Sequence, residues 1–264
     1  MGLVSIERHG GAAVVSYANP PFGTMTGAGA QEMLDKLRPL ADEPAVRAIV
    51  ITGGLPGVFI RHYDVDELSV ASDGAKDTPP PPADWDGRTA GGYLALVDLI
   101  YEAPKPVVAA INGLCMGGGF ELALSCDIRI ASPDVTAIGL PETRVGIFPG
   151  GGGTQRLPRV VGEAKALEII LRGLTFDAQE ALRIGAVHEV HDRPVERALE
   201  MAAEWGERGA EGIAYAKRLT RAALDRPIWE GLADERRAFQ TVMRTASARE
   251  GLARAKGPAL IQAL

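Results

Sequence analysis

The sequence predicts an α/β fold in which strands alternate with helices and pair in parallel. Two continuous apolar runs, residues 45–52 and 107–111, have the composition of strands that are buried on both faces of a sheet. Between them lies a segment with apolar residues at helical spacing, among them Leu94, Val97 and Ile100. Because strands here are joined through helices, we expect a parallel sheet with right-handed crossovers.

The other elements follow from the same patterns. Two short apolar segments flank the turn His9-Gly10-Gly11 and predict a strand pair. Glycines end several helical patterns, as at Gly173 and Gly185, where C-terminal caps are expected. The predicted strands cover residues 4–6, 12–17, 45–52, 107–111, 127–131, 135–139 and 186–190. The predicted helices include Met33–Leu40, 92–101, a helix after Gly119 that runs through Ser125, 164–171, 177–184, 194–208, 210–224, 228–246 and a short terminal helix.

Residues 69–88 have the composition of an irregular segment. They contain Ser72-Asp73-Gly74 and four consecutive prolines, Pro79 to Pro82. Consecutive prolines disfavour both helices and central strands, and favour extended polyproline geometry. The sequence leaves two interpretations open, a surface loop and a lid over a substrate pocket.

Composition excludes several classes of protein. The chain has 264 residues and a net charge of −6, with no basic stripe, so we expect no nucleic-acid partner. No apolar stretch approaches the roughly 20 residues of a spanning helix, and residues 1–11 do not have the pattern of a signal peptide. We therefore expect a cytoplasmic protein without a membrane partner. Two cysteines, Cys115 and Cys126, are too few for a disulfide framework and are expected to be small buried residues.

A glycine triplet, Gly117-Gly118-Gly119, is the first candidate for chemistry. It follows a predicted strand and opens a helix. Glycine allows close approach of a ligand to the backbone, and free N–H groups at a helix start attract an anion or a carbonyl oxygen that becomes one. The alternative is that the triplet serves only tight packing between strand and helix.

Two carboxylates accompany the glycines. Glu121 falls in the first turn of the predicted helix among apolar neighbours, and burial there is expected to raise its pKa. Glu142 follows Pro141 after a predicted strand, and could instead pair with Arg144. Two acids beside bare amides can hold an oxyanion and move protons next to it.

The sequence lacks the motifs of several other catalytic and binding sites. No Gly-x-Ser-x-Gly elbow and no Gly-Lys-Ser/Thr phosphate loop is present. His188 and His191 have no metal-site partners at a suitable spacing, so no metal site is expected.

Taken together, these motifs resemble the enoyl-CoA hydratase/isomerase (crotonase) superfamily, strongly over about residues 105–190. The segments that carry the resemblance are Lys105–Gly113, Gly117–Ala123, Cys126-Asp127, Pro141-Glu142, Gly146, Pro149–Arg159, Gly162 and Thr175–Val187.

The resemblance implies a crotonase-like spiral of ββα units over residues 1–193. It also implies a helical C-terminal region over residues 194–264 that forms a homotrimer or a dimer of trimers. The expected ligand is an acyl-CoA thioester. Its carbonyl oxygen would be held by the backbone amides of Gly118 and Tyr63, in an oxyanion hole.

The resemblance also assigns the remaining site residues. Glu121 and Glu142 match the two catalytic glutamates of the hydratases. The residues expected to contact substrate are His62, Asp64, Gly117, Pro141 and Gly150. The chain departs from the family at Arg61-His62-Tyr63, where small residues are usual, and at Asp66, where a lysine is common.

The implied reaction is addition of water across the 2,3 double bond of a trans-2-enoyl-CoA, a step of fatty acid metabolism that needs no cofactor. Alternatives within the family are an enoyl-CoA isomerase or an acyl-CoA hydrolase. A non-catalytic CoA-binding protein is the alternative outside enzymes.

Overall fold

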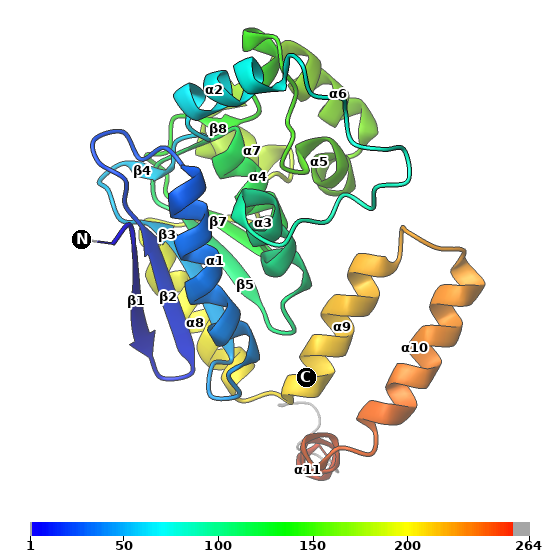
Figure 1. Cartoon of the computed structure of the whole chain (residues 1–264). Coiled ribbons are helices and arrows are strands. Elements are labelled where there is room, and N and C mark those ends of the chain that lie inside the picture. Colours follow the sequence, from blue (N-terminus) through cyan, green and yellow to red (C-terminus); the bar gives the residue numbers. More distant parts are fainter. Residues whose placement is uncertain (1, 256–264) are drawn as a thin grey trace.

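The computed structural model describes residues 2–255, and its largest sheet has six strands. Their order is β1-β2-β3-β5-β7-β10 (Figure 1). The strands are β1 (Val4–His9), β2 (Ala12–Tyr17), β3 (Ala48–Gly53), β5 (Val107–Ile111), β7 (Ile128–Ala131) and β10 (Glu189–Val190). The β1–β2 hairpin is antiparallel and the other neighbours are parallel, with Val50 opposite Val108. The predicted α/β class is therefore confirmed.

A second sheet consists of very short strands in the order β4-β6-β8-β9. They are β4 (Val58–Ile60), β6 (Leu114–Met116), β8 (Ile138–Gly139) and β9 (Thr175–Phe176). The first three are parallel and β9 is antiparallel to β8. The sequence analysis missed β4, β6 and β9, because two or three residues are too few to show a strand pattern.

Four predicted strands begin later than expected: those predicted over 45–52, 127–131, 135–139 and 186–190. Local hydrogen bonds give the reason for the last two. Of residues 135–139 only the last two are in β8, because Val135 donates a hydrogen bond to the Ser132 carbonyl in a turn. Of residues 186–190 only the last two are in β10, because the amides of Ala186 and Val187 bond the Ala181 carbonyl at the end of a helix.

The chain repeats a unit of two strands and a helix. The stretches β3-β4-α2, β5-β6-α4 and β7-β8-η1 each give one strand to the large sheet, one to the small sheet and then a helix. The helices are α2 (Val65–Ala75), α4 (Gly118–Ser125) and the 3₁₀ helix η1 (Glu142–Val145). This arrangement confirms the expected ββα units. Since the short strands are parallel neighbours, the three helix starts meet at one end of the small sheet.

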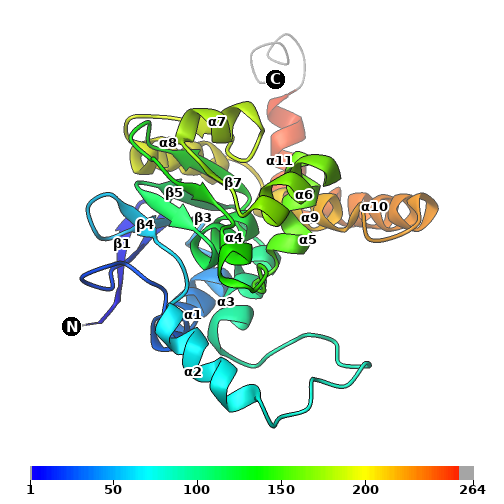
Figure 2. The ribbon, with the colours of Figure 1, turned by 90° about the horizontal axis from the view of Figure 1, so that it is seen from above.

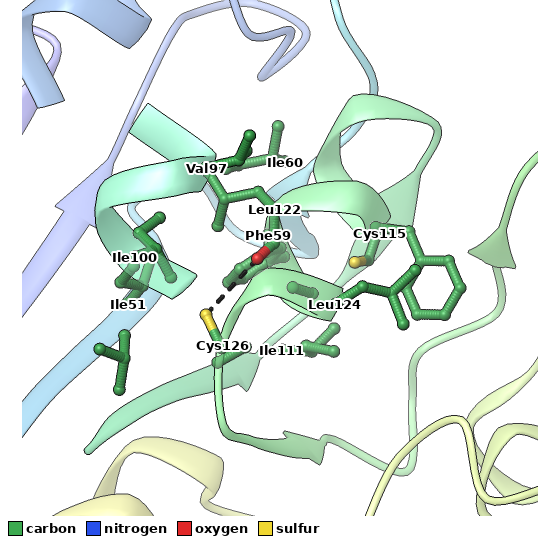
Figure 3. Packing of buried hydrophobic residues seen from close by; sticks show 14 of the residues in the cluster. Ile51, Phe59, Ile60, Val97, Ile100, Ile111, Cys115, Leu122, Leu124 and Cys126 are labelled. Atoms are coloured by element: carbon green, nitrogen blue, oxygen red, sulfur yellow. Dashed lines mark hydrogen bonds between the residues drawn. The ribbon is translucent and has the colours of Figure 1, made fainter. Parts of the chain in front are cut away.

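Helices cover both faces of the large sheet. On one face lie α1 (Gly27–Asp42), α3 (Gly92–Glu102) and α4, and on the other lies α8 (Pro194–Gly206). Neighbouring residues alternate between the two cores, with Ile49 and Ile51 facing the first and Val50 facing α8. Figure 3 shows Leu122 and Leu124 of α4 among side chains of the first core. Burial on both faces explains the continuous apolar runs in the sequence.

Both cysteines lie in this first core as free, buried thiols, as expected. Figure 3 shows Cys126 with its sulfur directed to the Leu122 carbonyl, at 3.5 Å.

The segment 69–88 is only partly irregular. Its first seven residues continue α2, which begins at the cap residue Asp64 and ends at Ala75. The expectation of an irregular segment was wrong there because Asp64 accepts hydrogen bonds from the amides of Asp66 and Glu67 and so starts a helix. After α2 the chain runs to α3 as a loop that projects from the body (Figure 2).

The remaining helices pack on α4, η1 and β10 or form the C-terminal part. They are α5 (Gly153–Val161), α6 (Glu163–Arg172), α7 (Ala178–Arg183), α9 (Ala210–Ala222), α10 (Ile228–Val242) and α11 (Ala246–Arg254). Figure 1 shows α9 and α10 as a hairpin beside the sheets, with α10 farther away. Asp127 anchors α9 through Lys217 (2.8 Å) and Arg221 (2.6 Å).

Helix α8 packs against the large sheet. The expected boundary between a core and a C-terminal region at residues 193 and 194 stays a prediction. Within residues 2–255 no helix is long and apolar enough to cross a bilayer.

Candidate active site

The glycine triplet forms the turn from β6 into α4. Gly117 has φ +52°, a conformation that favours glycine. A Cβ on Gly119 would lie 1.9 Å from the Ile60 carbonyl oxygen, which no side chain can tolerate. The triplet therefore brings the start of α4 against β4 and the residues that follow it.

Tyr63 and Gly118 lie side by side across this contact. The position of a Cβ on Gly118 would be 3.3 Å from the Tyr63 nitrogen and 3.1 Å from the Tyr63 Cβ. Met25 bonds both backbone neighbours of Tyr63, donating to the His62 carbonyl and accepting from the Asp64 amide. Among the described residues, neither the Tyr63 amide nor the Gly118 amide has a hydrogen-bond acceptor. Two adjacent free N–H groups can hold one carbonyl oxygen.

Glu121 is buried in the first turn of α4, with 4% of its surface exposed. Its Oε1 accepts hydrogen bonds from the amides of Gly151 (2.7 Å) and Gly153 (2.8 Å), so the loop before α5 fixes its orientation. Burial raises the pKa of Glu121, and these two hydrogen bonds and the charge of Arg156 oppose that rise. Its other oxygen, Oε2, lies 2.8 Å from the point where a Gly151 side chain would begin.

Glu142 opens η1 on the other side of the glycine turn. Its Oε1 lies 3.2 Å from the position of a Cβ on Gly117. Its Oε2 is buried and has no hydrogen-bond partner within residues 2–255. Burial, reinforced by the charge of Glu121, raises the pKa of Glu142 to about 7. The two predicted acids are therefore close enough to influence each other's protonation, and Glu142 forms no ion pair with Arg144 in the described structure.

The other expected site residues occupy different positions. The Cβ of His62 lies beside Gly117, and its Nδ1 is 2.7 Å from the Tyr63 carbonyl oxygen. Pro141 precedes the first turn of η1, and Gly150 is exposed in the loop before α5. Asp64 caps α2 and accepts a hydrogen bond from the Thr24 hydroxyl (2.9 Å), so its carboxylate is already engaged. These hydrogen bonds hold the pKa of Asp64 below its usual range.

The sequence analysis missed Tyr93, at the start of α3. Its hydroxyl donates to the Gly118 carbonyl, and its ring packs edge-on against Tyr63, with 5.5 Å between centroids. Its Cε1 lies 2.5 Å from the point where a Gly151 side chain would begin. Tyr93 thus contacts both residues that offer free amides and the loop that holds Glu121. A single tyrosine after Gly91-Gly92 carries no sequence signal for this role.

Arg156 was also missed. It donates to the Gly151 carbonyl (2.8 Å) and pairs with Asp98 (3.2 Å), which supports the loop from behind. Arg156 also lines a cavity of about 710 Å³ between α9 and the sheet, whose walls do not include either acid. No cluster of three or more potential metal ligands occurs in the described part of the chain.

Known proteins share both the sequence and this architecture. The family model for enoyl-CoA hydratase/isomerase matches residues 7–257. Bacillus subtilis YngF, whose name assigns it to the same family, is 38% identical over 229 residues, which cover 84% of this chain and 83% of YngF. The methylglutaconyl-CoA hydratase of Rattus norvegicus is 34% identical over 81% of this chain and 66% of its own length.

Solved structures of enoyl-CoA hydratases have the same fold as this chain. The enoyl-CoA hydratase of Bacillus anthracis superimposes with a TM-score of 0.85 at 29% identity, over 96% of each chain. With the ββα units, the free amide pair and the two glutamates beside the glycine turn in place, the match shows that this chain belongs to the enoyl-CoA hydratase/isomerase family.

Proposed function

We propose that the protein is an enoyl-CoA hydratase that adds water across the 2,3 double bond of a trans-2-enoyl-CoA. The observation that carries this proposal is the pair of glutamates, buried Glu121 and half-buried Glu142, on the two sides of the glycine turn that offers the Gly118 amide. The names of relatives, including the methylglutaconyl-CoA hydratase, support the same class of reaction.

The free amides of Gly118 and Tyr63 are the proposed oxyanion hole. They would donate to the thioester oxygen and polarise the conjugated double bond, so that C3 becomes electrophilic. When water adds at C3, negative charge develops on this oxygen in an enolate, and the two N–H groups stabilise it. Removal of one such donor typically costs about 3 kcal/mol of barrier. Main-chain donors do not depend on the bulk of the Tyr63 side chain.

The two glutamates would share one proton and hold the attacking water. Two nearby carboxyls titrate as a pair, and because the charge of Glu121 raises the pKa of Glu142, a state with one ionised and one protonated carboxyl is favoured over a doubly ionised one. The ionised carboxylate accepts a proton as water oxygen bonds to C3. The protonated carboxyl donates its proton to C2 of the enolate. The pair regains one proton in each turnover, and the reaction requires no metal or redox cofactor.

Glu142→Gln tests this proposal. The substitution keeps the size of the side chain but removes its acid–base function, so crotonyl-CoA hydration should fall about 10²–10⁴-fold. Circular dichroism should show an unchanged fold. Full retained activity would remove Glu142 from the mechanism.

A panel of three assays separates hydration from related reactions. Double-bond isomerisation and thioester hydrolysis should both be slower than hydration on the same acyl-CoA substrates. Thioester hydrolysis as the dominant reaction would replace the proposed function, and absence of turnover beside micromolar CoA binding would indicate a binding protein.

We also propose that the C-terminal helices assemble the chain into a homotrimer. The C-terminal hairpin exposes large apolar side chains, and exposed apolar surface of this kind commonly marks an interface. They are Leu224, Ile228, Trp229, Phe239 and Met243, of which Trp229 is 72% exposed. Light scattering should give the mass of a trimer or a dimer of trimers, and Trp229→Glu should lower it.

A further inference from the structure

The cavity between α9 and the large sheet is separate from the candidate active site. Its volume of about 710 Å³ falls within the roughly 300–1,000 Å³ that is typical of pockets for small molecules. Its walls come from α9 and from residues of α3, α4, α5, α8 and β7. Its lining residues include neither glutamate of the candidate site and neither residue of the free amide pair. A ligand in this cavity would therefore bind apart from the thioester.

Basic side chains outnumber carboxylates around this cavity. Among the described residues, Asp127 is the only acidic one on the wall, and it pairs with both Lys217 (2.8 Å) and Arg221 (2.6 Å). Three other basic side chains pair with acids outside the wall. Six cations thus share four carboxylates, which leaves an excess of two positive charges. The cations are Arg129, Arg156, Arg159, Arg208, Lys217 and Arg221, and the carboxylates are Asp98, Asp127, Glu204 and Asp225.

Arg129 of β7 is buried, with 3% of its surface exposed, and forms no ion pair within residues 2–255. Its Nε and Nη1 donate to backbone carbonyls, among them those of Ala123 (3.2 Å) and Cys126 (3.0 Å) at the end of α4. Its Nη2 has no acceptor among the described residues. Burial lowers the pKa of Arg129 to about 10, so the group stays charged at neutral pH. A buried charge without a counter-ion is unfavourable, and an anion in the cavity would relieve this cost.

Arg221 of α9 brings a second cation to the same region. After burial, the charge of Arg221 also lowers the pKa of Arg129, because the two groups are close. Its Nε and Nη2 bond Asp127 and the Ser125 carbonyl, whereas its Nη1 has no acceptor within residues 2–255. Its guanidinium carbon lies 3.8 Å from the centroid of the Tyr101 ring, which fixes its position. Two neighbouring guanidinium groups with unused N–H donors suit one carboxylate.

The remaining wall is mostly apolar. Leu224 is 73% exposed, although it lines the cavity. A small inorganic anion would leave this surface in water, whereas an anion with an apolar chain would cover it, at a gain that grows with the area buried. The net charge of −6 does not attract anions in general, so the local cations must supply the attraction. The apolar wall residues are Leu124, Ile128, Val160, Trp205, Ile213 and Leu224.

We propose that this cavity is a binding site for a monocarboxylate with an apolar chain of medium length, such as octanoate. The carboxylate lies on Arg129 and Arg221, and the chain lies along the apolar wall. The site does not depend on the proposed hydratase function, because it shares no lining residue with the two glutamates or the free amide pair.

Calorimetry with carboxylates of increasing length tests the class of ligand. Octanoate should bind in a saturable way, and affinity should rise about two- to fourfold per methylene from butanoate to octanoate. 1-Octanol, which has the same chain without the charge, should bind about tenfold more weakly or less well still. Saturating coenzyme A should leave the affinity for octanoate unchanged, because the two sites are separate.

Two variants test the location. Ala216 is an exposed residue of α9 on the cavity wall, and Ala216→Glu would place a carboxylate beside the cations. It should lower the affinity for octanoate about tenfold or more. Ala210→Glu, on the same helix but outside the wall, is the matched control and should bind octanoate like the wild type. Arg129→Gln should also weaken binding about tenfold or more, and if it does not fold, Ala216→Glu alone decides the question.

Several results would overturn the proposal. Wild-type affinity for octanoate in Ala216→Glu, or loss of binding when coenzyme A is added, would place the carboxylate elsewhere. Equal affinities for phosphate and octanoate would contradict the apolar chain. A lower mass of Ala216→Glu in light scattering would identify the cavity as a contact between copies of the chain. Glu142→Gln should keep full affinity for octanoate, so a failure of the hydratase proposal and a failure of this one give different results.

Discussion

The six-stranded and the four-stranded sheets are built from different kinds of strand. Strands β3 and β5 of the large sheet are five or six residues long and nearly fully buried. The strands of the small sheet have two or three residues. The residues just before β4 and β6 approach through bare backbone, since a Cβ on Gly113 would lie 1.8 Å from the Gly57 carbonyl carbon. Yet the free amides and the acids of the candidate site follow the small strands β4, β6 and β8. The large sheet therefore buries the apolar surface, whereas the small sheet positions the candidate catalytic groups.

The largest effect should come from the acid that follows β6. Glu121→Gln retains a carbonyl oxygen for the amides of Gly151 and Gly153, so the loop should keep its place. Loss of the carboxylate should lower kcat about 10²–10⁴-fold at an unchanged melting temperature. Steady-state kinetics on crotonyl-CoA measures this, with Glu180→Gln on α7 as a matched control. A normal rate would show that the small sheet does not supply the acid pair.

A substitution in the large sheet should instead lower stability and leave kcat unchanged. Ile130 of β7 is fully buried in the core beneath α8, away from the acids. Ile130→Ala should lower the free energy of unfolding by about 3 kcal/mol, because it leaves a cavity. Urea denaturation measures this, and kcat per folded molecule should stay at the wild-type value. A reduced kcat in fully folded Ile130→Ala would break the separation between the sheets.

The pH dependence of stability should reveal the cost of positioning Glu142. In the folded protein this carboxyl keeps its proton up to a pKa of about 7, whereas the ordinary pKa of a glutamate is 4.5. The folded state therefore binds more protons between these values, and the contribution of Glu142 to stability is full below pH 4.5 and lost as pH rises toward 7. The loss should be about 3 kcal/mol. Denaturation across this range should show a steeper fall in wild type than in Glu142→Gln, in which only Glu121 keeps a raised pKa, and parallel curves would contradict this.

The smallest effect should come from Tyr93, which contacts both residues that offer free amides. Tyr93→Phe keeps the ring against Tyr63 and Gly151 but removes the hydrogen bond to the Gly118 carbonyl. We expect kcat to fall about fivefold, equivalent to roughly 1 kcal/mol, with KM unchanged. An unaltered kcat would restrict Tyr93 to packing.

The difference between the two sheets also explains which parts of the fold and of the candidate site could be predicted from the sequence. Apolar runs such as residues 107–111 predict the large sheet, since burial on both faces leaves a strong pattern. The glycine triplet and Glu121 predict one half of the site, and the family resemblance was needed for Tyr63 because β4 has no pattern of its own. Tyr93 could not be predicted, since its place depends on packing between α3 and the loop before α5 and not on any local signal.

The spiral of units has a consequence for how the protein acquires activity. Residues 63, 93, 118, 121, 142 and 151 come from successive turns of the chain, and no single unit carries both amides and both acids. Long-range pairings of this kind form late, because the intervening chain must first be ordered. During refolding, fluorescence or circular dichroism should therefore recover before catalytic rate, and fragments that end before β8 should have no activity even where their helices form.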